Sequence, residues 1–522
     1  MKKILIIFSL IGAMFIYSCS DSILDTVPTE SVSGTDIFSD AENALVAVNG
    51  IYRLMYTGSW GSGWESENGG LPAFILAMDL LAEDHVMDGS GSGWFWYDYV
   101  FANWGDFSHN AGRQYQMWNF FYTLISNANY ILVHDGVIEG DEDMANYVMG
   151  QAYAIRSYAY MNLVQSYQQN DPTKPGVPIY TEPTVVGTEG QPRGTVQNVY
   201  DLANDDIDKA IEYLENSSVT QMHKSHIDKY VAYGLKARYA LVQQDFETAL
   251  AAAEEALKSP ASIVPFENTR YVNNIDAANA MWGLGIQTDQ AMGSWDIFSH
   301  MDADSESTYS QARHLISSWL YTRIPETDAR RAWWTSPVLP DGEEWGEAGT
   351  TNGSFSPYVQ TKLVYSNVSA SEGDHILMRK EEIALMAAEA ACHLERFTEA
   401  RNYVSMVGTM RDSDYETRLA GFVNSKVYNQ STTGDMTTLM DEILFQRRVE
   451  LWSEIPRIHD LQRLGLGFTR GFDGSNHPSS ARAANVNTAP ASPAFILWIP
   501  QAEFDGNENM DATKDQNPSQ RG

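Results

Sequence analysis

Aromatic side chains next to acidic and amide groups are the residues of this chain whose types and spacing point most directly to chemistry. The stretch GSGWFWYDYVFANW, residues 91–104, is half aromatic and begins with glycine and serine. A flat indole or phenol ring can cover the apolar C–H face of a sugar ring, while Asp and Asn side chains hydrogen-bond to its hydroxyl groups. The tracts that combine both features supply ten candidate ligand-binding residues: Trp60, Trp64, Trp94, Trp96, Tyr97, Asp98, Tyr99, Asn103, Trp295 and Asp296.

If residues 94–99 formed an extended strand, their side chains would point alternately to two opposite sides. Successive side chains of a strand point to opposite sides. Trp94, Trp96 and Asp98 would then face one side, and the residues between and after them would face the other. We expect one side to pack on the protein and the other to meet the ligand.

Recognisable catalytic signatures are missing from the sequence. It contains no HExxH, no GxSxG nucleophile elbow, no phosphate-binding loop and no CxxC pair. The histidines are scattered without metal-ligand spacing, and DGNENMD near the C-terminus lacks the Gly and the late Glu of a calcium loop. We therefore predict no catalytic residue, no metal site and no cofactor. A glycoside hydrolase remains an alternative, because acidic pairs such as those in EDHVMD are plentiful.

The first residues of the chain predict export and lipid attachment. MKK followed by ILIIFSLIGAMFIY is a basic segment and an apolar stretch too short to span a bilayer comfortably, which is typical of a secretory signal. The stretch ends in IYSC, which resembles a lipobox, so residues 1–18 are the predicted signal peptide and Cys19 the predicted lipidation site. Residues 19–34 would form the tether. The other cysteine, Cys392, is predicted to be buried in the core.

Net charge narrows the range of partners. The chain of 522 residues carries a formal charge of -34. Nucleic acid is excluded as a partner, because binding it requires clustered Lys and Arg. Highly sulfated or uronate-rich polymers are disfavoured for the same reason.

Helical segments must position the aromatic tracts. Apolar spacings of three and four residues predict helices in DIFSDAENALVAVNGIYRLMY, with Ser39 or Asp40 as N-cap, and in QYQMWNFFYTLISNANYILVH. KARYALVQQDFETAL aligns with AAEAACHLERFTEAR when shifted by 151 residues, and each pattern predicts helix, short turn, helix. Small residues and a Phe after the turn are typical of stacked tetratricopeptide-like repeats.

Two further helical pairs begin at QAYAIRSYAYMNLVQSY and at LMDEILFQRRVELW. Long aromatic loops interrupt the array at about 57–72, 88–113, 260–312 and 332–372. Trp282, in the apolar stretch NAMWGLGI, is predicted to lie in a buried strand. The expected fold is therefore mainly α, a helical-repeat scaffold that carries irregular aromatic loops and few short strands.

A series of stretches along nearly the whole chain points to one protein family. They include CSDSILDTVPTESVSGTDIF, NGIY, DLLAEDH, GVPI, HILMRKEEIALMAAEA, LWIPQAEF and DQNP. The best match is RRVELWSEIPRIHDLQRLG, at Arg447, Glu450, Leu451, Glu454, Arg457, Asp460, Leu461 and Arg463. In these stretches the chain resembles the SusD/RagB family of outer-membrane nutrient-binding lipoproteins. It departs from the family pattern at Gln446 and Ile455, where Glu and Gly are common.

This resemblance implies a tetratricopeptide-like scaffold, with residues 35–522 as a single SusD-like domain. It implies a non-catalytic protein, lipid-anchored at the outer membrane and facing the cell exterior, that binds a glycan for a SusC-like TonB-dependent transporter. Family members bind ligand through aromatic loops of the N-terminal third and of the region after the second repeat. A peptide-capturing, RagB-like protein remains the alternative within the family. The alternation of charge with Leu451 and Trp452 in the best-matching stretch predicts an amphipathic helix with structural ion pairs and not an active site.

Overall fold

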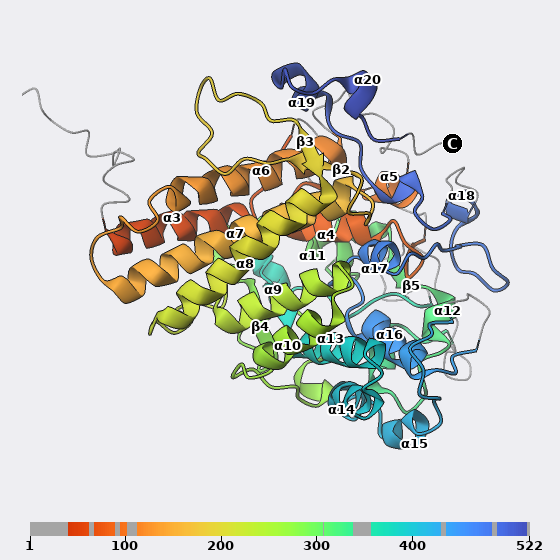
Figure 1. The fold of residues 1–522 in the computed structure, drawn as a ribbon. Coiled ribbons are helices and arrows are strands. Elements are labelled where there is room, and N and C mark those ends of the chain that lie inside the picture. The colour runs from red at the N-terminus through yellow and green to blue at the C-terminus, as the bar shows by residue number, and fades with distance from the viewer. Residues whose placement is uncertain are drawn as a thin grey trace, which may run out of the picture.

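Helices are the main secondary structure of the described residues, in agreement with the predicted class (Figure 1). The computed structural model describes residues 40–61, 67–88, 94–101, 112–305, 307–337, 357–429, 435–482 and 488–518. The longer helices are α3 (Ala41–Leu54), α4 (Leu71–Asp79), α6 (Arg113–Leu132), α7 (Glu142–Tyr167), α8 (Val196–Asn216), α9 (Lys229–Val242), α10 (Phe246–Ala256), α13 (Lys380–His393), α14 (Phe397–Gly408), α16 (Leu439–Glu450) and α17 (Arg457–Arg463).

Consecutive helices pack side by side into one array. α6 contacts α7, α7 contacts α8, α8 contacts α9, α9 contacts α10, α10 contacts α13 and α13 contacts α14. The colours of Figure 1 follow this order from orange through green to cyan. Asp40 caps α3 by accepting a hydrogen bond from the backbone N–H of Asn43 at 2.9 Å, which confirms one of the two predicted caps.

The two segments related by a shift of 151 residues fold in the same way. α9 with α10 and α13 with α14 are both helix–turn–helix pairs. Each turn contains one residue with a left-handed backbone, Gln244 with φ 60° and Glu395 with φ 61°. The N–H group after that residue bonds to the carbonyl oxygen five positions earlier, at 2.9 and 2.8 Å respectively. The alanines predicted to lie between the helices are all buried: Ala237, Ala240, Ala249, Ala388, Ala391 and Ala400.

Phe246 fills the gap between these two pairs, as its place after the turn predicts. Its ring stacks on His393 in the last turn of α13, with 3.8 Å between the ring centroids. Cys392, the preceding residue, is fully buried, and burial raises the pKa of its thiol to about 12. The prediction of a core cysteine is therefore confirmed.

Strands are few and short, and the strands of the described residues pair as three antiparallel couples. These are β1 (His85–Met87) with β5 (His314–Ile316), β2 (Pro175–Pro178) with β3 (Arg193–Thr195), and β4 (Ala280–Leu284) with β6 (His375–Arg379). Trp282 of β4 pairs with Met378 and is fully buried, as predicted. Its indole N–H donates to the carbonyl oxygen of Ser225 at 2.9 Å.

Shorter helices lie in the connections between the longer ones. They are α5 (Trp96–Tyr99), α11 (Phe298–Met301), α12 (Ser318–Tyr321), α15 (Tyr415–Leu419), α18 (Ser479–Arg482), α19 (Gln501–Gly506) and α20 (Ala512–Asp515). The C-terminal segment with α19 and α20 contacts α6, where the Trp118 indole N–H donates to the Glu503 carboxylate at 3.1 Å. Within the described residues, no helix combines the length and the hydropathy needed to cross a membrane.

Two large apolar clusters hold this arrangement together. The scaffold core lies within the helical array, and the loop core lies under the aromatic connections, around Phe95, Tyr99, Trp333 and Trp452. α16 belongs to both. Its residues Ile443 and Leu444 pack in the scaffold core, whereas Phe445 and Val449 pack in the loop core.

Candidate ligand-binding surface

The aromatic stretch at residues 94–99 is a turn and a short helix, so the expected extended strand is wrong. Phe95 has a left-handed backbone with φ 57°, and α5 follows it directly. The N–H of Phe95 donates to the Glu67 carboxylate at 2.7 Å, which anchors the turn. Helical spacing therefore decides which side chains face inward.

The inward-facing residues of this stretch are Phe95, Asp98 and Tyr99, each fully buried. Asp98 accepts hydrogen bonds from Arg113 at 2.9 and 3.3 Å. Tyr99 bonds through its hydroxyl to a ring nitrogen of His477 at 2.7 Å. Asp98 and Tyr99, both predicted to bind ligand, instead hold the stretch against the protein.

Burial also shapes the acid–base properties of the anchor. The Arg113 guanidinium donates to the backbone carbonyl of Glu67 at 2.6 Å and faces the carboxylate of that residue at 3.7 Å. Burial, followed by the nearby Asp98 carboxylate, raises the pKa of Glu67 to about 7. Two carboxyl groups thus share one guanidinium beneath the aromatic residues.

The outward-facing residues are Trp94 and Trp96, both partly exposed, and Tyr97, which is 49% exposed. Trp94 packs against Tyr309, with 4.2 Å between ring centroids, and Trp96 rests on Tyr99 at 5.4 Å. We call Trp94, Trp96, Tyr97 and Tyr309 the aromatic surface. The sequence reasoning missed Tyr309 as an individual residue, although it lies in one of the predicted loops, 260–312.

Trp60 is a buried core residue, so the prediction that it binds ligand is wrong. Its exposed fraction is 7%, and its indole N–H donates to the Thr57 carbonyl at 2.7 Å. The ring edge packs on Phe120, 4.9 Å between centroids, so the indole fills the scaffold core. Trp64, Asn103 and Cys19 lie outside the described residues.

Trp295 and Asp296 have different environments although they are neighbours. Trp295 is partly exposed, and its ring covers Gly58 so closely that a Cβ there would stand 2.7 Å from the indole. Asp296 is fully buried and accepts hydrogen bonds from a His375 ring nitrogen at 3.0 Å and from the Phe298 backbone at 2.8 Å. Asp296 therefore positions the loop, and of the two residues only Trp295 is partly exposed.

Trp333 and Trp334, which the sequence left undecided, are buried in the loop core. Trp319 is partly exposed and lies between two guanidinium groups, with Arg323 3.9 Å and Arg448 4.7 Å from the ring centroid. Its ring is therefore in contact with cations, which distinguishes it from the rings of the aromatic surface.

The charged residues of the best-matching stretch form ion pairs, as predicted, and these pairs are buried. The expected amphipathic helix is wrong, because every residue of α16 is buried and the helix ends at Glu450, before Leu451 and Trp452. Glu450 is fully buried and accepts hydrogen bonds from Arg330, Arg379 and Arg411 at 2.8 to 3.1 Å. Burial alone would raise the pKa of Glu450, but these guanidiniums, Arg411 foremost, hold that pKa well below its usual value. The network ties α16 to loop residues that are distant in sequence.

Metal binding finds no support in the part of the chain that the structure describes, where no group of three or more His, Cys, Asp or Glu side chains could hold an ion. The DGNENMD stretch folds on itself and on residue 191 instead. Asn507 accepts from the N–H of Asn509 at 3.0 Å and donates to the Gln191 carbonyl at 2.8 Å.

Comparison with known proteins places this fold in a family. A family profile described as "Starch-binding associating with outer membrane" matches residues 81–241, and a second, described as "SusD family", matches residues 343–519. SusD-like protein P2 of Formosa agariphila is 24% identical over 538 aligned positions, covering 98% of this chain and 99% of that protein.

Several solved structures share this fold. A SusD-like carbohydrate-binding protein of Bacteroides vulgatus is 22% identical, with a TM-score of 0.72 over 91% of this chain and 98% of that one. A SusD superfamily protein of Bacteroides thetaiotaomicron is also 22% identical, with a TM-score of 0.72 over 92% and 100% of the two chains. A laminarin-binding SusD-like protein is 18% identical, with a TM-score of 0.64 over 92% and 100%. The chain belongs to the SusD/RagB family.

Proposed function

We propose that this protein is a non-catalytic, lipid-anchored component of the outer membrane that binds a glycan and passes it to a SusC-like TonB-dependent transporter. The observation that carries the proposal is the aromatic surface. Its rings are partly exposed and are held in place from below by the buried Asp98, Tyr99 and Arg113. Flat rings whose orientation is fixed before binding suit the apolar faces of sugar rings.

Trp295 extends this surface in the proposal. Glu67 anchors the turn of Phe95, and Gly69, two residues further on, packs against the Trp295 backbone. The segment 67–69 therefore contacts both aromatic loops. A glycan of several sugar units can engage both.

A neutral glycan is the favoured ligand class. One matching family profile is described as starch-binding, and one similar structure is described as laminarin-binding. The net charge of -34 opposes polyanionic polymers by electrostatic repulsion. We therefore choose starch and laminarin oligosaccharides as the first ligands to test.

The test measures oligosaccharide affinity by isothermal titration calorimetry on the wild-type protein and on Trp94→Ala, Trp96→Ala, Tyr97→Ala and Trp295→Ala. Loss of one stacking ring should weaken binding by about tenfold. Tyr130→Ala is the matched control, since Tyr130 is also exposed but lies 17 positions beyond Arg113 on α6, about 25 Å along the helix. Failure of the wild-type protein to bind any glycan, with uptake unchanged in the four variants, would refute the proposal.

Anchoring and delivery need separate tests. Cys19→Ala should release the protein from the membrane fraction, because a single thiol carries the predicted anchor. A TonB-dependent transporter should co-purify with the wild-type protein from mildly solubilised outer membranes. If the protein is purified without any transporter, the proposed delivery step would be refuted, whereas the proposed glycan binding would not be affected.

A further inference from the structure

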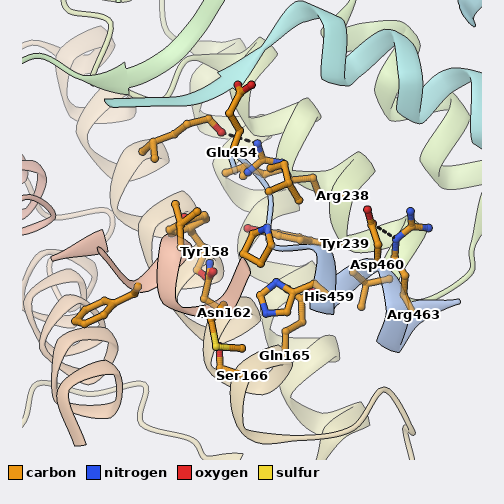
Figure 2. A pocket seen from close by; sticks show the side chains of 18 of the residues that line it. Tyr158, Asn162, Gln165, Ser166, Arg238, Tyr239, Glu454, His459, Asp460 and Arg463 are labelled. Atoms are coloured by element: carbon orange, nitrogen blue, oxygen red, sulfur yellow. Dashed lines mark hydrogen bonds and ion pairs between the residues drawn. The ribbon is translucent and has the colours of Figure 1, made fainter. Parts of the chain in front are cut away.

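A cavity of about 90 Å³ lies inside the helical array, and its lining includes no residue of the aromatic surface. Its walls come from α4, α6, α7, α9, α13, α16 and α17 and from residues near them. Figure 2 shows the polar side chains of α7, α9 and α17 around this space. Because one water molecule needs roughly 10–15 Å³, the cavity has room for several waters or for one small organic solute.

One part of the cavity wall is apolar. Leu71 and Phe74 of α4, Phe121 of α6 and Leu235 of α9 line it, and all four side chains are buried. A strongly hydrated inorganic ion would lose its water shell there without compensation. The apolar wall instead favours a solute with a hydrocarbon portion.

The carboxylates of the opposite wall already have cationic partners. Glu454 accepts from Arg379 through both oxygens at 2.7 Å and lies 2.5 Å from the Lys362 ammonium. Asp460 accepts from Arg447 at 2.9 Å and from Arg463 at 2.8 Å. Because both carboxylates already pair with cations, they would attract a cationic ligand only weakly.

Among the described residues that line the cavity, in contrast, one guanidinium donor and one histidine ring nitrogen remain without a partner. Arg447 is only 6% exposed, and within the described residues its Nη1 has no hydrogen-bond partner. The Nε2 atom of His459 is likewise buried and unpartnered among those residues. Burial lowers the pKa of His459 to about 4, so its ring is neutral at neutral pH. A buried guanidinium N–H without an acceptor is costly, which indicates an occupant that accepts from it.

We propose that this cavity binds a small monocarboxylate with a short apolar body. The carboxylate accepts from Arg447 Nη1, and the hydrocarbon portion packs on the wall formed by Leu71, Phe74, Phe121 and Leu235. A charge-assisted hydrogen bond to a guanidinium favours a carboxylate over a neutral ligand of the same shape. This site is independent of the proposed glycan surface.

The experiment titrates the purified protein with acetate, butyrate, hexanoate and benzoate, using calorimetry and the shift of the thermal unfolding midpoint. Butyramide is the neutral control ligand. We expect saturable binding and a raised midpoint for at least one carboxylate, best for one that fills the cavity, and binding at least about tenfold weaker for butyramide.

Asn162→Trp is the main variant, because it fills the cavity without breaking an ion pair. Asn162 is a neutral residue that lines the cavity and donates to the carbonyl of Tyr158 in its own helix, at 2.8 Å. Asn127→Trp is the matched control, since Asn127 is also partly exposed, donates to the Thr123 carbonyl at 2.8 Å, and lies outside the cavity wall. We expect Asn162→Trp to abolish carboxylate binding and Asn127→Trp to leave it unchanged.

Arg447→Gln tests the proposed contact itself and should weaken binding about tenfold or more. If this variant does not fold, the two tryptophan variants still decide the question. No binding by any of the carboxylates, equal binding of butyrate and butyramide, or unchanged binding in Asn162→Trp would each overturn the proposal. A crystal structure in which ordered waters occupy the cavity in the presence of saturating butyrate would overturn it as well.

Discussion

The scaffold core and the loop core are stabilised in different ways. In the scaffold, regular helices approach closely at alanines in equivalent places of the two aligned repeats, and buried ion pairs such as the one between Arg156 of α7 and Asp206 of α8 join neighbouring helices. In the loop core, buried guanidinium groups take the place of regular secondary structure. Arg470, for example, donates to the backbone carbonyls of Leu80, Ala82 and Tyr99. Irregular backbone can be buried only when its polar groups find such partners.

The largest expected effect comes from breaking the network around Glu450. Glu450→Ala leaves three buried guanidiniums without their common carboxylate, and we expect it to reduce the free energy of unfolding by about 3–5 kcal/mol. Glu247→Ala is the control within the scaffold, because its pair with Arg396 is exposed. Denaturant unfolding measures both, and a loss below about 1 kcal/mol for Glu450→Ala would contradict the assigned role of the network.

A second test compares the stability lost when a tryptophan is removed from the scaffold core and when one is removed from above the loop core. Trp60→Ala removes a ring from the scaffold core and should cost about 3–5 kcal/mol of stability. Trp96→Ala removes a partly exposed ring above the loop core and should cost about 1 kcal/mol or less. Equal losses of stability would mean that Trp96 serves packing and would weaken its place in the aromatic surface.

The pH dependence of stability tests the buried Glu67 beneath the aromatic surface. Since the pKa of Glu67 is raised to about 7 in the folded protein, its stabilising contribution is complete below the unfolded pKa of about 4.5 and is lost as pH rises through about 7. We expect the wild-type protein to lose about 3 kcal/mol over this window relative to Glu67→Gln. Burial lowers the pKa of His85 to about 3, and this opposing titration is common to both proteins, so it cancels in the difference. Superimposable pH profiles would contradict the assignment.

The smallest expected effect concerns the repeat turns. Glu395 has a left-handed backbone, and its 2.8 Å ion pair with Lys426 is exposed and so contributes little to stability. Glu395→Gly should therefore stabilise the protein by about 0.5–1 kcal/mol in thermal or denaturant unfolding. Gln244→Gly should gain less, because the Gln244 side chain donates to the Arg463 carbonyl at 2.9 Å. The reverse order would show that the two turns are not energetically equivalent.

The contrast between the cores explains what the sequence could predict. The scaffold helices and the turn between Ala240 and Phe246 follow from periodicity and small-residue spacing, which act over a few residues. The loop core depends on contacts between distant positions, such as the one between Asp98 and Arg113 or the one between Arg330 and Glu450. Composition could identify the aromatic loops, but the left-handed Phe95 decides that Tyr97 points outward and Tyr99 inward. No periodicity in the sequence signals that turn.

The packing of α16 in both the scaffold core and the loop core affects how quickly a ligand can bind. Because one helix packs in both cores, the loops cannot shift without disturbing the array. Under the proposed function, the rings of the aromatic surface are pre-arranged for a glycan, and little ordering entropy is lost on contact. Association should then be limited by diffusion and orientation, with affinity differences between glycans appearing mainly in their residence times.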